Sequence, residues 1–201
     1  MVDFENPLAV KLRKQIVQAL STYNLIEEGD KLMVCVSGGK DSSVLLPLLE
    51  AIKGRAPYNF EFEAVMLDQK QPGFDATVFK KWVESLGIKL TILEHDTYSI
   101  VKEKVTSGVY CSMCSRLRRG ILYNFASKNG FSKLVLGHHR DDLNETTLLN
   151  LFYSGKLSAM PPKLKSDDGR NILIRPMVFV AEKDIIQLAE SWKVQTMPCN
   201  L

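Results

Sequence analysis

A chain of 201 residues is long enough for one α/β domain with a sizeable hydrophobic core. Its content of 45% apolar and 24% charged residues is ordinary for a globular protein, and no run reaches the roughly 18 apolar residues that a membrane span needs. The formal charge of +3 permits a nucleic-acid partner without requiring one. Residues 1–15 have two acids before their first base and no apolar run, so we expect no secretory signal, no membrane partner and a cytoplasmic location.

The first third of the chain predicts a helix, a strand and a second helix. Residues 7–26 have Pro7 at their start and apolar residues at helical spacing, which is typical of an amphipathic helix. The segment KLMVCVS, residues 31–37, is continuously apolar at its centre and predicts a fully buried strand. A helix over 41–53 follows, in which Pro47 should produce a kink or cost about 3 kcal/mol.

The same alternation continues through the rest of the chain. We expect strands at 60–68, 89–96, 133–137 and 171–176, and helices at 75–87, 115–130, 141–155 and 181–192. Such alternation favours right-handed crossovers and an α/β fold with a parallel open sheet covered by helices on both faces, similar to a Rossmann fold. Residues 1–201 should form one domain, on which the N-terminal helix, about 1–28, packs. Residues 156–170 are the long predicted loop.

The segment SGGKDS, residues 37–42, joins the first predicted strand to its helix. Ligands of parallel sheets bind at this position, beyond the carboxyl ends of the strands. A Walker loop would need Gly where Val34 stands and Ser or Thr where Asp41 stands, and the spacing of a Rossmann fingerprint is also missing. A plain glycine turn beside a surface lysine, Lys40, is the alternative.

The residue types of this segment suit a phosphate group. Gly38 and Gly39 let the backbone approach a ligand closely, Ser37 and Ser42 offer hydroxyls, and the helix N-terminus favours an anion. Asp41 would repel a bare phosphate unless a cation bridged the two. The segment therefore predicts an anion site that includes Mg²⁺.

The cysteines suggest a metal or redox site. Cys35 stands within the apolar first strand and is expected to be a buried thiol of the core. Cys111 and Cys114 form a C-x-x-C pair in a chain without a secretory signal, which favours a metal or redox role over a structural disulfide. The spacing alone leaves half a zinc site and a dithiol pair open.

Ser-Gly-Gly-Lys-Asp-Ser after a buried strand resembles the signature of the PP-loop (N-type) ATP pyrophosphatases. The resemblance implies an adenine nucleotide alpha hydrolase-like fold. It also implies an enzyme that cleaves ATP between the α- and β-phosphates, adenylates its substrate, and releases pyrophosphate and AMP.

Further motifs resemble the tRNA 2-thiocytidine synthetases (tRNA cytidine 2-sulfurtransferases), from about residue 30 to the last residue. They are LDQKQPGF (67–74), CSMCSRLRRG (111–120), LGHHRDD (136–142), MPPKLKSDDGR (160–170) and IRP (174–176). The resemblance implies ATP-dependent replacement of oxygen by sulfur on a cytidine of the tRNA anticodon loop. Its implied partners are tRNA, a sulfur donor such as a cysteine desulfurase, and a second copy of the chain.

The resemblance also distributes roles among the residues. It implies catalytic roles for Asp41, Asp141, Cys111 and Cys114. It implies that ATP is bound by Ser37, Gly38, Gly39, Lys40, Asp41, Ser42, Asp68, Gly137, His138 and Arg175. Cys111 and Cys114 would be metal ligands of a [4Fe-4S] cluster held by only three cysteines, which leaves one iron open to carry a sulfide.

The third cysteine of that cluster departs from the family pattern. The family shows Pro-Cys-Asn-Leu-Cys, whose second cysteine is the expected ligand. This chain reads Pro198, Cys199, Asn200 and Leu201 and then stops. We expect that it is C-terminally truncated or that Cys199 substitutes.

Simpler alternatives stay open for several assignments. Asp141 and Asp142 can serve as helix caps, and Arg175 can form a surface ion pair. The basic residues suit RNA phosphates or are merely solvated: Lys102, Lys104, Arg116, Arg118, Arg119, Lys163, Lys165 and Arg170. A lysidine-type tRNA ligase, which needs no cysteine pair, and a nucleotide-binding module without catalysis are the alternative functions.

Overall fold

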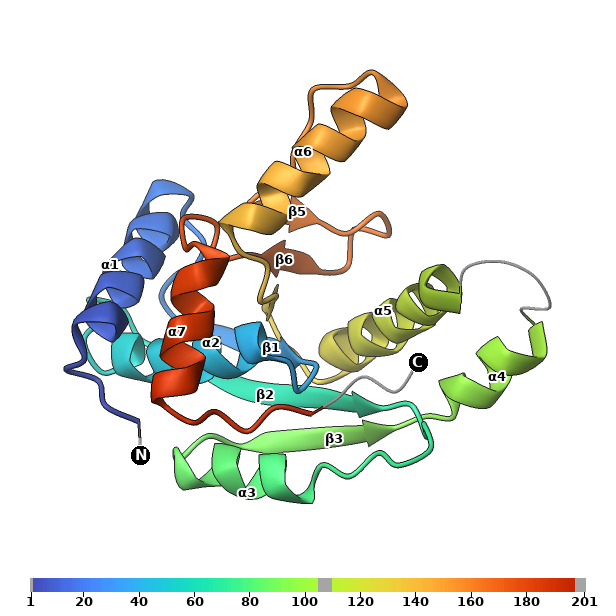
Figure 1. Ribbon diagram of the computed structural model, residues 1–201, viewed down its shortest axis with the longest axis horizontal. Helices are drawn as coiled ribbons and strands as arrows, with labels where there is room; N and C mark the ends of the chain where they lie inside the picture. Colours follow the sequence, from blue (N-terminus) through green and yellow to red (C-terminus); the bar gives the residue numbers. More distant parts are fainter. Residues whose placement is uncertain (1, 105–109, 198–201) are drawn as a thin grey trace.

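A six-stranded sheet forms the centre of the protein, in the strand order β3-β2-β1-β4-β6-β5 (Figure 1). The computed structural model describes residues 2–104 and 110–197, with side chains for 2–103 and 113–197. The strands are β1 (Asp30–Val36), β2 (Phe60–Asp68), β3 (Leu90–Glu94), β4 (Lys133–Val135), β5 (Lys163–Lys165) and β6 (Ile172–Ile174). Strands β1, β2, β3, β4 and β6 are parallel, which confirms the predicted α/β sheet.

Strand β5 is the exception, because it runs antiparallel to β6 at the edge of the sheet. The predicted parallel sheet thus has one antiparallel edge strand, and the prediction of a loop over 156–170 is wrong for residues 163–165. The reason is the short connection between the two strands. The carboxylate of Asp168 accepts hydrogen bonds from the Ser166 hydroxyl and the Arg170 amide, and Gly169 supplies a φ of +70°. So short a link can join two strands only as a hairpin.

The helices are α1 (Pro7–Thr22), α2 (Lys40–Lys53), α3 (Thr77–Ser85), α4 (Thr97–Lys104), α5 (Tyr110–Lys128), α6 (Arg140–Ser154) and α7 (Glu182–Ser191). Helix α4 was not predicted, because it lacks a regular apolar stripe; Thr97 and Val101 are its buried residues among those described. Helix α2 runs as one helix through Pro47, which lies buried within it. No helix of the described residues is long and apolar enough to cross a membrane.

The helices cover both faces of the sheet, as predicted. Leu32 and Val34 of β1 belong to a core shared with α1, α2, α3 and α7, while Met33 between them packs with residues of α5. Because successive side chains of a strand point to opposite faces, this central strand is buried on both. Figure 1 shows α1, α2 and α7 grouped together, with α5 apart from them.

A buried ion pair joins β1 to β4 at the end of the sheet opposite the glycine loop. The side chain of Lys133 is 3% exposed, and its ammonium lies 2.6 Å from Asp30 and 2.9 Å from Glu27. The Ser132 hydroxyl donates a second hydrogen bond to Asp30. These bonds satisfy a charge that would otherwise be costly to bury.

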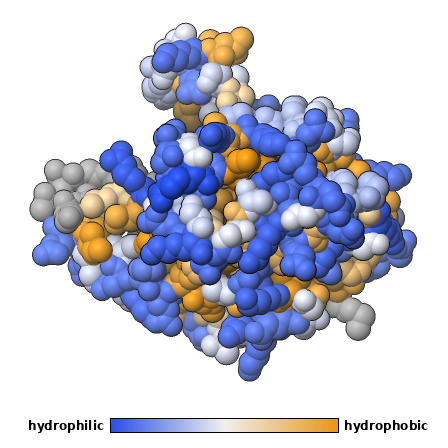
Figure 2. Space-filling view, turned by 180° about the vertical axis from the view of Figure 1, so that it is seen from behind, coloured by the Kyte–Doolittle hydropathy of each residue, from blue (hydrophilic) through white to orange (hydrophobic). Residues whose placement is uncertain are grey.

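Helix α6 stands out from the body of the protein (Figure 1). None of its residues, all of which the structure describes, is buried. We define the α6 tip by its apolar side chains, which are between 44% and 85% exposed: Leu148, Leu149, Leu151, Phe152, Tyr153 and Leu157. Figure 2 shows the corresponding knob, with apolar residues at its end.

We expect Asp30→Ala to lower the free energy of unfolding by about 3 kcal/mol, because the Lys133 ammonium would stay buried without its nearest carboxylate. Urea denaturation measures this loss. Glu84→Ala is the control, since its pair with Lys80 is about half exposed and should be worth less than about 1 kcal/mol. Equal losses in the two variants would contradict the role given to the buried pair.

Candidate functional site

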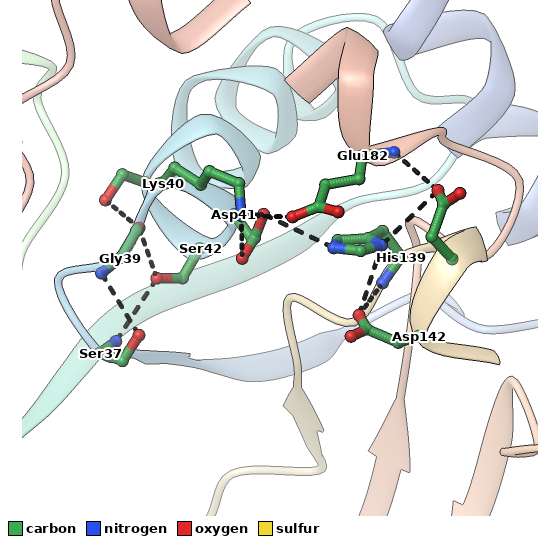
Figure 3. Close-up of polar contacts among 10 residues, drawn as sticks. Ser37, Gly39, Lys40, Asp41, Ser42, His139, Asp142 and Glu182 are labelled. Atoms are coloured by element: carbon green, nitrogen blue, oxygen red, sulfur yellow. Dashed lines mark hydrogen bonds and ion pairs between the residues drawn. The ribbon is translucent and has the colours of Figure 1, made fainter. Parts of the chain in front are cut away.

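The glycine loop, residues 37–42, turns back on itself between β1 and α2 (Figure 3). The Ser37 hydroxyl accepts a hydrogen bond from the Gly39 amide, and the Ser42 hydroxyl accepts one from the Ser37 amide. Gly38 has a φ of +80°, a conformation that side-chain-bearing residues rarely adopt. The loop thus leaves the first N–H groups of α2 facing outward at the end of the sheet.

Gly137, at the end of β4, allows this strand to approach the loop closely. A Cβ atom at this position would lie 3.1 Å from the Ser42 amide nitrogen and 3.3 Å from its Cα. Both contacts are to backbone, which cannot give way easily. Gly137 therefore sets the spacing between two neighbouring strand ends.

Three helix N-termini meet beside the loop, those of α2, α6 and α7. Asp141, in the first turn of α6, accepts a hydrogen bond of 2.7 Å from the Glu182 amide at the start of α7. Asp142 accepts one of 2.8 Å from the His139 amide at the start of its own helix. Both carboxylates thus cap helices and oppose the partial positive charge of the N-termini.

His139 lies at the centre of these N-termini and is 5% exposed. Its Nε2 is 3.8 Å from Asp41, and its Nδ1 is 3.5 Å from Asp142 and 3.9 Å from Asp141. Within the described part of the chain, His139 Nδ1 and Asp41 Oδ1 are buried without a hydrogen-bond partner. His139 was not recognised as a site residue from the sequence, where the motif GHHRDD is the only local indication of its place.

Lys40 points toward α7 (Figure 3). Its ammonium lies 2.8 Å from Glu182 and 3.2 Å from Asp41. Burial tends to lower the pKa of Lys40, but the hydrogen bond to Glu182 and the charge of Asp41 outweigh it and raise the pKa above its ordinary value. Glu182 was not recognised from the sequence, because nothing in the local pattern links it to the loop.

Two adjoining hollows flank the loop and together form what we call the crevice. The first hollow, about 310 Å³, is lined by Leu67, Gln69, Phe74 and Met197 among others. The second, about 260 Å³, is lined by polar groups that include Asp41, Ser42, Gly137, His138 and Asp142. Ser37 and Arg118 line both hollows, so the loop and one guanidinium stand at the boundary between them.

His138 and Arg175 lie close to the second hollow. Burial lowers the pKa of His138, and the nearby charge of Arg175 lowers it further, so the imidazole is neutral at pH 7. Arg175 is 7% exposed and donates a hydrogen bond of 2.6 Å to the Pro161 carbonyl. Among the described residues Arg175 has no carboxylate partner, so the alternative of a surface ion pair is wrong.

Asp68 was expected to face the crevice, but its carboxylate is occupied by a neighbouring residue. It accepts a hydrogen bond of 2.7 Å from the Lys70 amide and lies 3.0 Å from the Lys70 ammonium. Asp68 is not among the residues that line the two hollows. In this structure it stabilises the turn after β2, where Lys70 has a φ of +60°.

Cys114 contacts Gln69, a residue that lines the first hollow, but is not itself among the lining residues. It is 6% exposed, and its thiol donates a hydrogen bond of 2.8 Å to the side-chain oxygen of Gln69. The side chain of Cys111 and all of Cys199 lie outside the described residues, so the predicted set of ligands is not tested. Cys35 was expected to be buried in the core, but it is only half-buried and lines the second hollow. Burial raises the pKa of its thiol to about 12, although the charge of Arg118 opposes the shift, so the thiol is neutral.

The residues predicted to contact RNA phosphates are scattered. Arg118 lines the crevice, the ammonium of Lys163 donates to the Asn24 carbonyl, and Arg170 pairs with Asp168 at 2.7 Å. Arg116, Arg119, Lys102 and Lys165 are exposed, and the side chain of Lys104 lies outside the described residues.

The segment 193–197 returns from the end of α7 to the glycine loop. The Met197 amide donates a hydrogen bond of 2.8 Å to the Gly38 carbonyl. A Cβ atom at Gly38 would lie only 2.8 Å from the Met197 Cβ. Met197 is thus part of the site although it stands about 160 residues from the loop.

Comparison with known proteins gave consistent matches. Residues 8–197 match the PP-loop domain family. The tRNA-cytidine(32) 2-sulfurtransferase of Bdellovibrio bacteriovorus is 66% identical over 200 residues, which are 100% of this chain and 77% of the relative. The protein of the same name from Tolumonas auensis is 55% identical over 98% of this chain and 65% of the relative. The chain thus spans about two thirds to three quarters of the length of these relatives.

A solved structure has the same fold. It is the U34-tRNA thiolase NcsA from Methanococcus maripaludis with its [4Fe-4S] cluster, with a TM-score of 0.75 and 23% sequence identity. The match covers 96% of this chain and 66% of that chain. At this identity the likeness concerns the fold alone.

We expect Gly38→Ala to lower the free energy of unfolding by about 1 to 3 kcal/mol, because the new methyl group would meet Met197 and the backbone would be strained. Urea denaturation measures the loss, and limited proteolysis should show the segment 193–197 cleaved faster. Gly54→Ala is the matched control, with a φ of −67° and open space around it. A Gly38→Ala protein as stable as the Gly54→Ala protein would contradict this packing.

Proposed function

The chain belongs to the PP-loop domain family and, within it, to the tRNA-cytidine(32) 2-sulfurtransferases, and on this premise we propose that it catalyses ATP-dependent 2-thiolation of a cytidine in the tRNA anticodon loop. The observation that carries the proposal is the joint placement of the glycine loop and Cys114. Gln69 lines the hollow beside the loop and also accepts the hydrogen bond from the Cys114 thiol. A nucleotide and a sulfur atom bound at these two places would be neighbours.

The glycine loop and the crevice fit ATP. The N–H groups at the start of α2 suit the departing pyrophosphate, since backbone N–H groups and the helix dipole both attract anions. The first hollow is large enough for a purine base, and Leu67, Phe74 and Met197 give it an apolar lining. We propose that Ser37, Gly38, Gly39 and Ser42 hold the phosphates and that Arg118 neutralises charge between the hollows.

The carboxylate of Asp41 fits Mg²⁺, because its Oδ1 is buried without a hydrogen-bond partner among the described residues, and a bound Mg²⁺ would take the place of the Lys40 ammonium 3.2 Å away. Bound there, Mg²⁺ would neutralise the charge that develops on the phosphates. We keep Asp141 as a positioning residue rather than a ligand, since its carboxylate already caps α7.

The proposed reaction has two displacements. The exocyclic carbonyl oxygen on C2 of cytidine attacks the α-phosphate of ATP, an oxygen–phosphorus bond forms, and the bond to pyrophosphate breaks. A sulfur nucleophile then attacks C2, the carbon–oxygen bond breaks, and AMP leaves with the former carbonyl oxygen. The neutral His138 beside the crevice can accept a proton during this sequence.

The cysteine pair suits an iron–sulfur cluster, because cysteine thiolates are the usual ligands of its iron atoms. Cys114 has a buried sulfur bonded to Gln69, which lines the first hollow, and Cys111 stands three positions earlier on the same helix, α5. A [4Fe-4S] cluster held by three cysteines supplies an open iron that can carry sulfide. We propose Cys111 and Cys114 as two of its ligands and a sulfur donor such as a cysteine desulfurase as the source of the sulfide.

We expect the full-length protein with ATP, Mg²⁺ and tRNA to release AMP and pyrophosphate and to form 2-thiocytidine. Cys114→Ala should abolish the formation of 2-thiocytidine but leave ATP binding unchanged, because the proposed role of Cys114 is confined to the transfer of sulfur. Ser85→Ala is the control, since the exposed Ser85 hydroxyl bonds to the Trp82 carbonyl on α3 and lines neither hollow, so the product should be unchanged. Mass spectrometry of tRNA nucleosides and a pyrophosphate assay measure both steps.

Each alternative function has its own outcome in this experiment. ADP and phosphate in place of AMP would contradict the PP-loop chemistry. AMP release by a protein that forms no thiocytidine and binds no iron would favour a lysidine-type ligase. Binding of ATP without turnover would leave only a nucleotide-binding module.

We also propose that two copies of the chain associate through the α6 tip. Residues 146–155 contain no charged side chain, and Lys156 is the one charged residue between them and Leu157, so a complementary surface should be mainly apolar. A second α6 tip offers such a surface, and a two-fold axis would bring the two tips together. An exposed apolar patch of several hundred Å² is typical of an interaction site.

Sedimentation velocity should show a dimer for the wild-type protein at about 10 μM, a concentration above the dissociation constant of an ordinary stable interface. The double variant Leu149→Glu/Phe152→Glu should be a monomer, because it buries two charges in the interface. Val78→Glu is the control, since Val78 is 58% exposed on α3, away from the tip. A monomeric wild-type protein would overturn the proposal.

A further inference from the structure

We propose that Glu182 is a positioning residue that holds the Lys40 ammonium outside the crevice and releases it when nucleotide phosphates bind. The inference deepens the proposed function in one respect, since it requires that the glycine loop bind ATP. It does not depend on tRNA or on an iron–sulfur cluster.

The geometry places Lys40 away from the predicted phosphate site. Lys40 is the first residue of α2 and directly follows Gly39, but its ammonium lies 2.8 Å from Glu182 on α7. Lys40 is not among the residues that line either hollow. In Figure 3 its side chain extends toward Glu182 and His139, while Ser37 and Gly39 lie at the opposite end of the view.

The backbone of Glu182 is held in place, whereas the long side chain of Lys40 can rotate away from it. The Glu182 amide is held by the carboxylate of Asp141, and Ile185 and Leu188 anchor α7 in the core. Lys40 has a flexible stem of four carbons, and its side chain is 32% exposed. Rotation of this stem is therefore enough to bring the ammonium from Glu182 to the loop.

The charges around Lys40 favour an exchange of partners. In the structure, one ammonium is shared by the carboxylates of Glu182 and Asp41. A cation that bound to Asp41 would weaken the second of these contacts. The phosphates of ATP then offer Lys40 more negative charge, close to its own backbone, than the half-exposed carboxylate of Glu182.

In this arrangement Glu182 and the nucleotide phosphates compete for the Lys40 ammonium. Binding of ATP must break the contact between Lys40 and Glu182, which lowers the apparent affinity for ATP. A ligand without phosphates leaves the pair intact. Glu182 therefore contributes to discrimination between adenosine and ATP, because only the phosphates give Lys40 new contacts that offset the loss of its contact with Glu182.

Isothermal titration with ATP and Mg²⁺ tests the inference. We expect Glu182→Gln to tighten ATP binding about threefold to tenfold and to leave adenosine binding unchanged. Lys40→Met should weaken ATP binding. In the Lys40→Met background, the substitution of Glu182 should change the affinity less than about twofold, because the contact is already gone.

Asp184→Asn is the matched control. Asp184 lies in the first turn of the same helix and pairs at 2.6 Å with Lys11 of α1, on a side of α7 that faces away from the loop. The variant removes the same charge and should leave the affinity for ATP unchanged. Circular dichroism melting curves identify any variant that is not folded.

Two results would overturn the inference while leaving the proposed function intact. Unchanged or weaker ATP binding by Glu182→Gln would show that Glu182 does not hold Lys40 back. Equal tightening with and without Lys40 would show that only long-range repulsion had been removed. A wild-type protein that binds no ATP at all would overturn the inference and the proposed function together.

Discussion

The convergence of three helix N-termini beyond the carboxyl ends of the strands is the constraint on which the site depends. Their partial positive charges would repel one another without the carboxylates of Asp41, Asp141, Asp142 and Glu182 in the first turns. The same field attracts phosphate. The protein therefore balances two demands, because enough negative charge must be present to hold the helices together and enough positive potential must remain to bind an anion.

The sequence was most informative where a residue type is required by backbone geometry or by burial. The glycine loop was placed correctly because glycine adopts the φ of Gly38 most easily, and five of the six predicted helices formed because their apolar stripes reach a core, whereas α6 has no buried residue. Helix α4 and strand β5 were missed because few of their side chains are buried. Their positions are set by a neighbour: the Gln69 carbonyl accepts from the Tyr98 amide, and β6 pairs with β5.

The candidate site was predictable only in part, since its members come from distant segments. The motifs located Ser37, Asp41, Gly137 and His138 at the crevice. They could not show that Asp68 is bound by Lys70, nor that Lys40 turns toward α7. Those outcomes depend on which charged group lies nearest in three dimensions. Pairs such as Lys40 with Glu182 are separated by most of the chain and leave no local pattern.

The contact of Met197 with Gly38 has a consequence for the order in which the protein matures on the ribosome. The loop is among the first parts of the chain to be synthesised, whereas the segment that covers it emerges only after residue 197 has passed the exit tunnel. The centre of the sheet shares this delay, since β1 lies between β2 and the later β4. A nascent chain therefore has its complete glycine loop only when nearly all of these residues have been translated, so an interrupted product would not acquire the finished crevice.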